Sequence, residues 1–334
     1  MRIGLAYDLK KAVTVGRGDP EDALEEYDYS ETVELIAGAL EARGHTVVKL
    51  GGGREFLSNI LRENVDMVFN IAEGRGIYRS REAQLPSVLE MLDIPYSGSD
   101  PQCLAICLDK PLTKKLVVAA GVLTPRWRVI TNSAELWGTS WDEFTFPAII
   151  KPAYEGSSKG IRLSSVVSSP QQVTEAVSRL LEFYRQPVMV EEFIAGEEVT
   201  VGIIGNSPPK VLGVMRILSK KREEHFVYSL EVKRDWKTLV DYECPAKLAA
   251  EVLEKVRESS LKAFNVLGCR DFTRLDFRVN PKGIPYFIEI NPLPGLGDYS
   301  DLVIMALKLG WSYEALIEAI LGAALERHPL CVRR

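Results

Sequence analysis

Asp276, Glu289 and Asn291 carry oxygen-bearing side chains in a spacing that could hold one metal ion. They lie in segment 271–297 (DFTRLDFRVNPKGIPYFIEINPLPGLG), whose alternating polar and apolar residues predict two strands joined by a short turn. Because successive side chains of a strand point to opposite faces, Asp276 shares a face with Arg274, and Glu289 shares a face with Asn291. Carboxylate and amide oxygens beside an arginine suit Mg²⁺, which usually binds one or two carboxylates together with phosphate.

The turn of this hairpin decides which side chains meet across the two strands. An even-length turn centred on Pro281 and Lys282 places Arg274 opposite Glu289, with Asp276 on the diagonal and roughly 7 Å between Cβ atoms. The alternation divides the second strand into two faces, one with Phe287, Glu289 and Asn291 and the other with Ile284, Tyr286, Ile288 and Ile290. A solvent-exposed charged face is the alternative interpretation, because antiparallel sheets commonly present one polar face.

A small polar loop could supply contacts to phosphate. The loop 153–160 (AYEGSSKG) lies between predicted strands at 148–151 and 161–166, and its glycines let backbone amides approach an anion closely. It is not a P-loop, because a glycine follows the lysine where that motif needs serine or threonine. Lys151, at the end of the preceding strand, would place an ammonium group at the mouth of the loop. An ordinary turn and a solvated lysine are the alternatives.

A second acidic segment could contact a nucleoside. Residues 188–193 and 198–204 predict two strands around a turn at 194–196. A strand that leads into such a hinge can offer backbone groups to the edge of an adenine, and Glu198 could bind ribose hydroxyls. Taken alone, the segment would be an acidic edge strand.

The elements that must position these residues fall into two patterns. Strands at 3–7, 46–50 and 65–71 alternate with helices at 30–44 and 55–62, which indicates parallel βαβ units in an open α/β domain. Further helices are predicted from Pro101, with Asp100 as N-cap, and from about Pro111 to Gly121. From Arg126 onward the strands are typical of antiparallel sheets.

The composition limits the classes of protein to which this chain can belong. A chain of 334 residues suggests two or three domains, and 46% hydrophobic residues can bury a large core. With 41 basic and 46 acidic residues, the charge gives no case for nucleic acid as a partner. No apolar run approaches the roughly 20 residues of a membrane span, so no membrane association is predicted. Five cysteines without a CxxC pair predict core thiols in a reduced, cytoplasmic protein.

Six motifs in the same order resemble the ATP-grasp superfamily, and most closely its D-alanine–D-alanine ligase family. They are IPYSGSD, LDKPLTKKL, IIKPAYEGSSKG, VEEFIAGEEVTV, RLDFRV and IEINPLPGLG, and together they extend over nearly the whole chain. The resemblance implies an ATP-grasp fold, α/β and α+β in class, with an N-terminal open parallel α/β (pre-ATP-grasp) domain. It implies a substrate domain at 1–105, a central lid subdomain at 106–195, and a C-terminal domain with the metal and oxyanion site at 196–334.

The same resemblance implies a reaction. A carboxylate of the first substrate would attack the γ-phosphate of ATP to form an acyl phosphate, and the amine of the second substrate would then displace phosphate. ATP and two Mg²⁺ ions are the implied cofactors, with Mn²⁺ as a possible substitute. The implied partners are amino acids or short peptides as substrates, and a second copy of the chain in a homodimer.

The matching motifs imply a role for each site residue. Contacts to ATP would come from Lys110, Lys151, Glu155, Gly156, Ser157, Ser158, Glu191, Glu192, Ile194, Glu198 and Lys233. The metal ligands would be Asp276, Glu289 and Asn291. Catalysis would depend on Ser157, on Arg274 and the amide of Gly295 at the oxyanion, and on Glu25 at the first substrate's ammonium, with Glu26 and Asp28 as rivals. Substrate contacts would come from Ser300, Arg234 and Glu73.

The sequence also departs from the family pattern. The family's Lys-Tyr pair is here Lys233 and Arg234, and family members without that tyrosine can accept other second substrates, including hydroxy acids. The family's His-Gly is here Glu73-Gly74, which predicts an anion in place of a neutral or cationic contact. The following segment, 75–81, is strongly basic. These departures leave the substrates open.

Three functions are therefore compared. The first is a ligase that makes a D-alanyl-D-alanine-like dipeptide. The second is a ligase of the same fold for a different amino acid, hydroxy acid or peptide pair. The third, a nucleotide-binding protein without catalysis, is disfavoured, because such a protein needs neither the metal face nor the arginine at the oxyanion.

Overall fold

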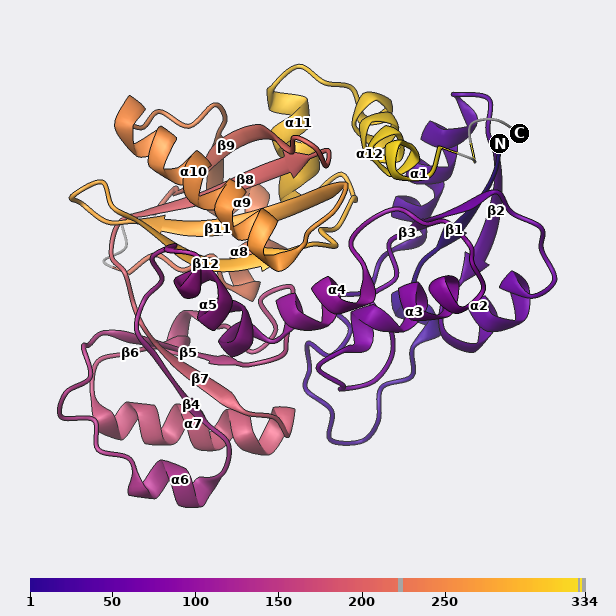
Figure 1. The fold of residues 1–334 in the computed structure, drawn as a ribbon. Coiled ribbons are helices and arrows are strands. Elements are labelled where there is room, and N and C mark those ends of the chain that lie inside the picture. Colours follow the sequence, from indigo (N-terminus) through magenta and orange to yellow (C-terminus); the bar gives the residue numbers. More distant parts are fainter. Residues whose placement is uncertain (222–224, 330, 332–334) are drawn as a thin grey trace.

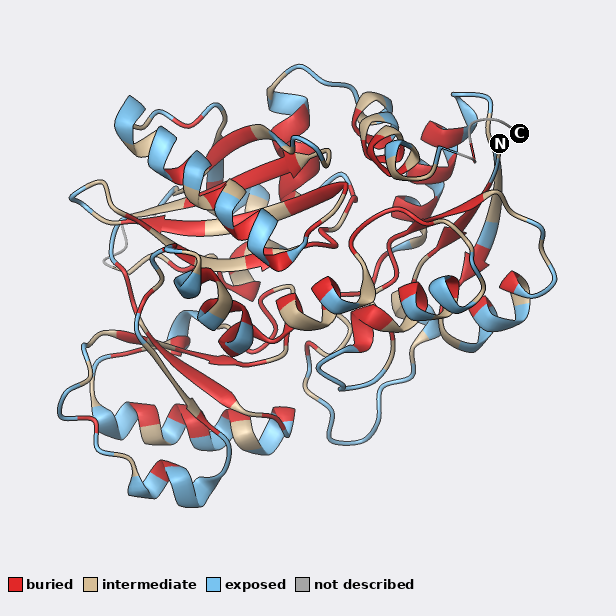
Figure 2. Cartoon of the chain, viewed as in Figure 1, coloured by how far each residue is buried: buried red, intermediate tan, exposed pale blue. Residues whose placement is uncertain are grey.

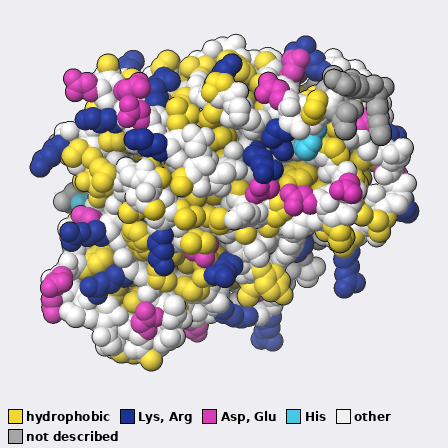
Figure 3. Space-filling model, viewed as in Figure 1, with side chains coloured by type: hydrophobic (Ala, Val, Ile, Leu, Met, Phe, Trp, Pro, Cys, Tyr) yellow, Lys and Arg dark blue, Asp and Glu magenta, His cyan; other side chains and the backbone are white. Residues whose placement is uncertain are grey.

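The computed structural model describes residues 1–221, 225–329 and 331, which form three β-sheets with helices packed on their faces (Figure 1). Buried residues concentrate on the strands and on the inner sides of the helices (Figure 2). Acidic and basic side chains are interspersed over the face shown in Figure 3. Among the described residues, we find no helix with the length and apolar character that crossing a bilayer requires.

The first sheet is parallel, as the alternating strands and helices predict. Its order is β2 (Thr46–Gly51), β1 (Arg2–Ala6) and β3 (Met67–Asn70). The helices of this part are α1 (Ser30–Glu41), α2 (Gly53–Ile60) and α3 (Gln84–Met91), with short 3₁₀ helices η1 (Lys10–Ala12) and η2 (Arg81–Ala83). Asp8 and the segment after Asn70 follow strand ends at one edge of the sheet, where ligands of such sheets bind.

Two capped helices lead from this sheet toward the rest of the molecule. The carboxylate of Asp100 accepts a hydrogen bond from the Cys103 amide (2.8 Å) at the start of α4 (Pro101–Leu108). The carboxylate of Asp109 likewise accepts from Leu112 (3.0 Å) at the start of α5 (Lys110–Ala119). Both helices begin close to the predicted positions, because an aspartate N-cap followed by proline favours a helix start.

The second sheet is antiparallel, with the order β4 (Trp127–Ile130), β7 (Val188–Glu192), β5 (Ala148–Pro152) and β6 (Val166–Val167). Helices α6 (Ser133–Gly138) and α7 (Pro170–Tyr184) cover one face. The strand predicted at 161–166 is wrong for most of its length. Its residues 163–165 form the 3₁₀ helix η3 (Leu163–Ser165), and only Val166 and Val167 pair with β5.

The third sheet has five antiparallel strands in the order β10 (Val240–Glu243), β9 (Lys210–Ser219), β8 (Glu197–Ile204), β11 (Phe272–Val279) and β12 (Pro285–Asn291). Helix α10 (Ala250–Leu267) covers one face and α11 (Asp301–Lys308) the other. Two short helices, α8 (Leu230–Arg234) and α9 (Trp236–Leu239), precede β10, and α12 (Tyr313–Arg327) packs beside α1 (Figure 1).

The register of the β11–β12 hairpin differs from the predicted one. Arg274 faces Asn291, and Asp276 faces Glu289. The pairing of Val279 with Pro285 leaves a five-residue connection, in which Gly283 has φ +71°, instead of an even-length turn. A bulge then shifts the register by one residue after Asp276.

This bulge also changes which side chains share a face. Phe287 and Ile290 both lie in the core. Ile288 lines a cavity together with its neighbour Glu289. The predicted separation of Ile288 from Glu289 is therefore wrong, because a bulged strand carries one extra residue against its partner.

Asp271, directly before β11, joins distant parts of the chain. It is fully buried, and its carboxylate accepts hydrogen bonds from the Gly98 amide (2.7 Å), from Asn206 Nδ2 (3.0 Å) and from two nitrogens of Arg327 (2.8 and 2.6 Å). The start of the hairpin is thereby fixed to the N-terminal part and to α12. The domain limits 1–105, 106–195 and 196–334 stay a prediction.

Candidate active site

Two cavities meet beside the β11–β12 hairpin. The larger, of about 440 Å³, lies between the N-terminal loop 25–29, α8 and the segment 291–301. The smaller, of about 70 Å³, lies between the second and third sheets. Tyr228 and Lys233 line both cavities, so a ligand in one would lie next to a ligand in the other.

The predicted metal ligands lie at this junction. The Asp276 carboxylate accepts from Thr200 Oγ1 (2.6 Å) and from Arg274 Nη2 (2.8 Å). Glu289 lies 3.9 Å from Arg274 Nη2 and 3.4 Å from Lys110 Nζ. Asn291 lines the larger cavity, while its Oδ1 accepts from the amide of Leu293.

The charge around Glu289 favours its ionised form. Burial alone raises the pKa of a carboxyl group, but Lys110 and Lys151, with two further cations, lower the pKa of Glu289 to about 2. Its carboxylate is therefore charged at neutral pH. A carboxylate facing a second one across the strands, close to several cations, is a donor set that a divalent cation with phosphate oxygens would fit.

Two buried lysines share the carboxylate of Glu191. Lys151 Nζ lies 3.0 Å from Oε1 and Lys114 Nζ lies 2.7 Å from Oε2. Burial, opposed by Glu191, lowers the pKa of Lys114 to about 8. Lys110 Nζ donates to the carbonyl oxygen of Glu155. Of these three lysines, Lys151 lines the smaller cavity together with Glu191.

Only some side chains of the polar loop 153–160 line the two cavities. Ser157 lines the larger cavity and Ser158 the smaller, and both have positive φ (+50° and +59°). Ser158 Oγ donates to the carbonyl of Tyr228 (3.1 Å), which ties the loop to the segment before α8. The Glu155 side chain points elsewhere, because it accepts from Gln186 Nε2 (2.7 Å) and from Arg81 Nη2 (3.2 Å).

The hinge after β7 lines the smaller cavity with Glu192, Ile194 and Glu198. Arg278 also lines it and pairs with Glu198 through Nη1 at 2.5 Å. The same guanidinium donates to the carbonyls of Ile194, Gly196 (3.0 Å) and Phe226 (2.9 Å). The hinge therefore has its shape fixed by one buried arginine.

Three comparisons with known proteins agree with this arrangement. Residues 116–322 match the family model described as "D-ala D-ala ligase C-terminus". A D-alanine–D-alanine ligase of Aquifex aeolicus is 35% identical over 87% of this chain and 94% of its own length, and one of Carboxydothermus hydrogenoformans is 34% identical over 88% and 93%. The chain belongs to the D-alanine–D-alanine ligase family.

Solved structures support the same family and fold. The D-alanine–D-alanine ligase of Bacillus anthracis complexed with ATP superposes with a TM-score of 0.74 at 25% identity, over 98% of both chains. The VanG D-Ala:D-Ser ligase of Enterococcus faecalis, at 21% identity and a TM-score of 0.73 over 97% of this chain and 99% of its own, shares the fold. The protein is accordingly an ATP-dependent ligase with the ATP-grasp fold.

All three candidate ammonium-binding carboxylates of the ligase line the larger cavity, but they differ in their ion pairs. Glu25 lines this cavity but pairs with Arg234 Nη2 (2.7 Å) and Lys10 Nζ (3.5 Å). Glu26 is held by Arg81 (2.5 Å) and Lys159 (3.0 Å). Asp28 lines the cavity, and no described cation forms an ion pair with it.

Two acidic groups of the ligase have pKa values moved toward neutrality. Burial, followed by the charge of Asp8, raises the pKa of Asp28 to about 7. Burial, followed by the charge of Glu82, raises the pKa of Glu73 well above its usual value. Glu73 lines the larger cavity, and its environment favours a neutral carboxyl rather than the expected anion.

The basic segment 75–81 does not present free cations to the substrate. Arg75 pairs with Asp8 (2.8 Å), Arg79 lies 3.5 Å from Asp109, and Arg81 is buried against Glu26. Its charge therefore serves the contact between the N-terminal and central parts of the chain.

Arg274 lines the larger cavity of the ligase beside Asp276 and Glu289. Its Nε is buried and has no hydrogen-bond partner among the described residues. Its Nη1 lies 3.5 Å from Asp301, the first residue of α11. Gly295 and Ser300 line the same cavity, and a Cβ added at Gly295 would lie 3.0 Å from Ser300 Oγ.

Sequence reasoning missed several site residues. Lys114 lies one helical turn after Lys110, and this spacing placed both on one face of α5. Arg278 continues the alternation of Arg274 and Asp276 along β11 and was detectable in the same way. The contact of Asp301 with Arg274 had no signal in the sequence, because it depends on the packing of α11 against the sheet.

Proposed function

We propose that the protein uses ATP to join the carboxylate of one amino acid or short peptide to the amine of another, with D-alanyl-D-alanine as the first product to test. The observation that carries this proposal is the junction of the two cavities. There two facing carboxylates, Asp276 and Glu289, lie beside Arg274 and Lys110. Phosphoryl transfer depends on positioning and on neutralising charge, and this junction offers both.

We assign metal binding to Asp276, Glu289 and Asn291. The hard oxygen donors and the low pKa of Glu289 fit Mg²⁺, or Mn²⁺ in its place, and we propose two ions. Bound there, the ions would neutralise charge on the phosphates during transfer. Asp276 is oriented for this by Thr200, and Glu289 by Lys110.

The smaller cavity fits the nucleotide. Ile149, Ile194 and Ile288 provide an apolar slot for a purine, and the hinge at 192–194 borders it. Glu198 would receive the ribose, and Lys110 and Lys151 would bind phosphate oxygens. Ser157 and Ser158, in the loop that bonds to the Tyr228 segment, would close over the phosphates. Lys233, which lines both cavities, would contact the transferred group.

The residues at the centre would serve the acyl transfer. The first substrate's carboxylate would take the γ-phosphoryl group, and attack by the second substrate's amine would form a tetrahedral centre with an anionic oxygen. The unpaired Nε of Arg274 and the Gly295 amide are donors for that oxygen. Removing one such donor typically costs about 10²–10³ in rate.

We place the first substrate's ammonium at Asp28, and no longer at Glu25. Glu25 already pairs with Lys10 and Arg234, whereas Asp28 forms no ion pair with a described residue. Ser300 and Arg234 would contact the second substrate, and Glu73 would lie beside the reacting groups. The larger cavity, at about 440 Å³, falls within the roughly 300–1,000 Å³ of sites for drug-sized ligands, which also supports peptide substrates.

The test is phosphate release from Mg²⁺-ATP across a panel of D- and L-amino acids, hydroxy acids and dipeptides, with products identified by mass. Release with D-alanine that yields its dipeptide supports the first choice. Turnover only with other acceptors assigns the protein to the second function. ATP binding without release on any acceptor would contradict the ligase proposal and favour a binding protein.

Two coarser properties complete the proposal. Cys103, Cys107, Cys244 and Cys269 form no disulfide, which supports a reducing, cytoplasmic location. We also propose a homodimer, as the family resemblance implies, and light scattering of the purified protein would test it.

A further inference from the structure

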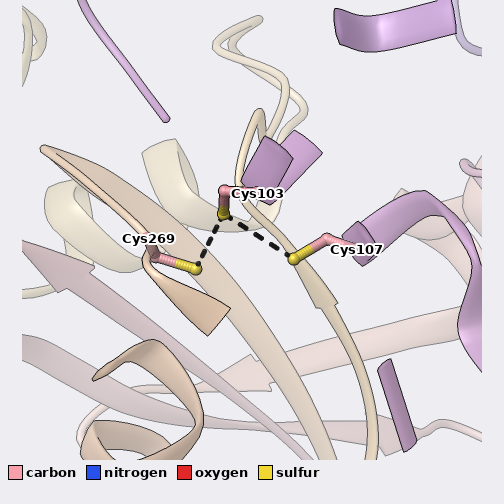
Figure 4. Close-up of side chains that lie close together, drawn as sticks. All are labelled: Cys103, Cys107 and Cys269. Carbon is pink, nitrogen blue, oxygen red and sulfur yellow. Dashed lines mark hydrogen bonds between the residues drawn. The ribbon is translucent and has the colours of Figure 1, made fainter. Parts of the chain in front are cut away.

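Three buried thiols meet where α4 packs against the segment between α10 and β11 (Figure 4). Cys103 and Cys107 lie one turn apart on α4, and Cys269 follows Gly268 at the end of α10. The Cys103 sulfur lies 3.9 Å from that of Cys107 and 3.6 Å from that of Cys269, and all three sulfurs lie within 4.8 Å of one another. Their sulfurs point toward a common centre.

These separations fit one atom bound to three sulfurs. Sulfur ligands about 2.3 Å from a shared ion lie roughly 3.8–4.0 Å apart in tetrahedral or planar trigonal geometry, and closer together around a pyramidal centre. The separations of 3.6 and 3.9 Å lie close to these values. No fourth cysteine, histidine or carboxylate joins the group within the described part of the chain. A structural zinc site takes four protein ligands, so this group favours an element that is satisfied by three.

The three thiols of the cluster are linked by hydrogen bonds, which change their pKa values. The hydrogen bonds that link Cys103 to Cys107 and to Cys269 lower the pKa of Cys103 and raise the pKa of each of its two partners. Cys103 also lies in the first turn of α4, where the helix dipole favours a thiolate. The nucleophilic form that binding requires is thus available at one sulfur.

Charge decides which element fits. The thiols belong to an apolar core that includes Val201, Phe264 and Leu275. Three thiolates around a divalent cation would leave a net negative charge in this core, and burying an uncompensated charge is expensive. Three thiolates around a trivalent centre form a neutral complex, which needs no further compensation.

We propose that Cys103, Cys107 and Cys269 form a binding site for a trivalent, thiophilic metalloid of the arsenic(III) type. Arsenous acid would exchange its three hydroxyl groups for three sulfurs, As(OH)₃ + 3 RSH → As(SR)₃ + 3 H₂O, without oxidation or reduction. The complex would join α4, which leads directly to Lys110, to the segment before β11, which carries Arg274. It would therefore fix two elements of the ligase site to each other.

Arsenite is the probe that tests this site. The folded, reduced full-length protein is titrated with arsenite, and binding is followed by native mass spectrometry and by sulfur-to-arsenic absorption in the ultraviolet. We expect one arsenic per chain, with a mass increase of one arsenic atom less three hydrogens, and a higher melting temperature. Cys103→Ser, Cys107→Ser and Cys269→Ser should each weaken binding by more than the roughly 10–100-fold that loss of an outer-shell partner costs.

Cys244→Ser and Cys331→Ser are the matched controls, because they remove thiols outside the cluster. Both should bind arsenite as the unchanged protein does. Circular dichroism shows whether each variant is folded, and an alanine variant at the same position replaces any serine variant that is not. The proposal would be overturned if the unchanged protein did not bind arsenite or if Cys269→Ser still bound it. It would also be overturned if binding displaced only two hydrogens, or if Cd²⁺ bound more tightly than arsenite.

Discussion

Arg234 and Glu25, which are 209 residues apart in the sequence, form an ion pair of 2.7 Å at the edge of the larger cavity. The pair joins α8 to the N-terminal loop, and Lys10 reaches the same carboxylate. The side chain at the position of the family tyrosine is therefore held against the N-terminal loop. Its position makes Arg234 the residue to change first when testing acceptor choice.

Replacing Arg234 by tyrosine should change the preference for the second substrate. The substitution removes a cation from the cavity wall that also contains Lys233 and Ser300, so we expect the ratio of kcat/KM between two acceptors to change by about tenfold. Steady-state kinetics across the acceptor panel measure it. Glu25→Gln is the control, because a pair with a half-exposed arginine contributes only about 0.2–1 kcal/mol. An unchanged profile in Arg234→Tyr would show that acceptor choice lies elsewhere.

Replacing Glu289 by alanine should abolish turnover. The variant loses the carboxylate that faces Asp276 and leaves Lys110 without its ionic partner. We expect kcat to fall by at least about 10³ while the protein stays folded, and phosphate release at saturating Mg²⁺-ATP measures this. Glu258→Gln, on the exposed side of α10, should have normal rates. A near-normal rate in Glu289→Ala would disprove the metal assignment.

Asp28 should control the pH dependence of first-substrate binding. Its pKa is about 7 in the free protein, so the carboxylate that attracts an ammonium group forms as the pH rises through 7. We expect kcat/KM for the first substrate to rise with pH up to about 7 and then level off. Asp28→Asn should lose most of its activity, and its kcat/KM should no longer rise with pH in this range. A wild-type pH profile in Asp28→Asn, or an equal loss in Glu25→Gln only, would restore Glu25 to this role.

Asp28→Asn should also change the free energy of unfolding, and the Asp28 carboxyl makes the protein less stable at the pH values at which it favours activity. Because the pKa of Asp28 is higher in the folded state than the ordinary value of 3.8, the folded protein is favoured at low pH and loses stability as the pH rises from about 4 to 7. Asp28→Asn should therefore be more stable than the parent at pH 8, by about 1–3 kcal/mol, and not at pH 4. Urea unfolding at the two pH values measures the difference, and a variant less stable at pH 8 would contradict it.

Replacing Arg278 by methionine should weaken ATP binding and destabilise the fold. The change leaves the partly buried Glu198 without its ion-pair partner and frees the hinge carbonyls, and breaking a buried pair in this way costs at most about 3–5 kcal/mol. Thermal unfolding and the KM for ATP measure the two effects. The double variant Arg278→Met with Glu198→Gln should recover part of the stability, because the stranded charge is gone. No recovery would mean that the carbonyl contacts, and not the ion pair, dominate.

The sequence predicted the sheets better than the contacts between them. The hairpin at 271–297 was evident from its alternation, and so was the placement of Arg274 and Asp276 on one face. Its register was not, because a five-residue connection and a bulge cannot be read from alternation alone. The misassignment of Ile288 follows from that bulge.

Long-range ion pairs were beyond prediction for a different reason. Arg81 looked like part of an exposed basic segment, yet it is fully buried against Glu26 and Glu155. Its partners depend on how the N-terminal loop packs on the polar loop 153–160. A local sequence pattern does not predict this packing. The choice of Glu25 over Asp28 rested on the family resemblance alone, because the ion pairs of Glu25 are long-range contacts of the same kind.

The ion pair of Asp271 determines how late in synthesis the catalytic centre can be completed. Its buried carboxylate is completed by Arg327, which emerges from the ribosome long after the hairpin that carries Arg274 and Asp276. Until then, the carboxylate of a nascent chain would have its hydrogen bonds from Gly98 and Asn206 but no ion-pair partner for its buried charge. The catalytic centre can therefore become rigid only once α12 has been translated, so prematurely terminated chains would be poorly folded and open to proteolysis rather than partly active.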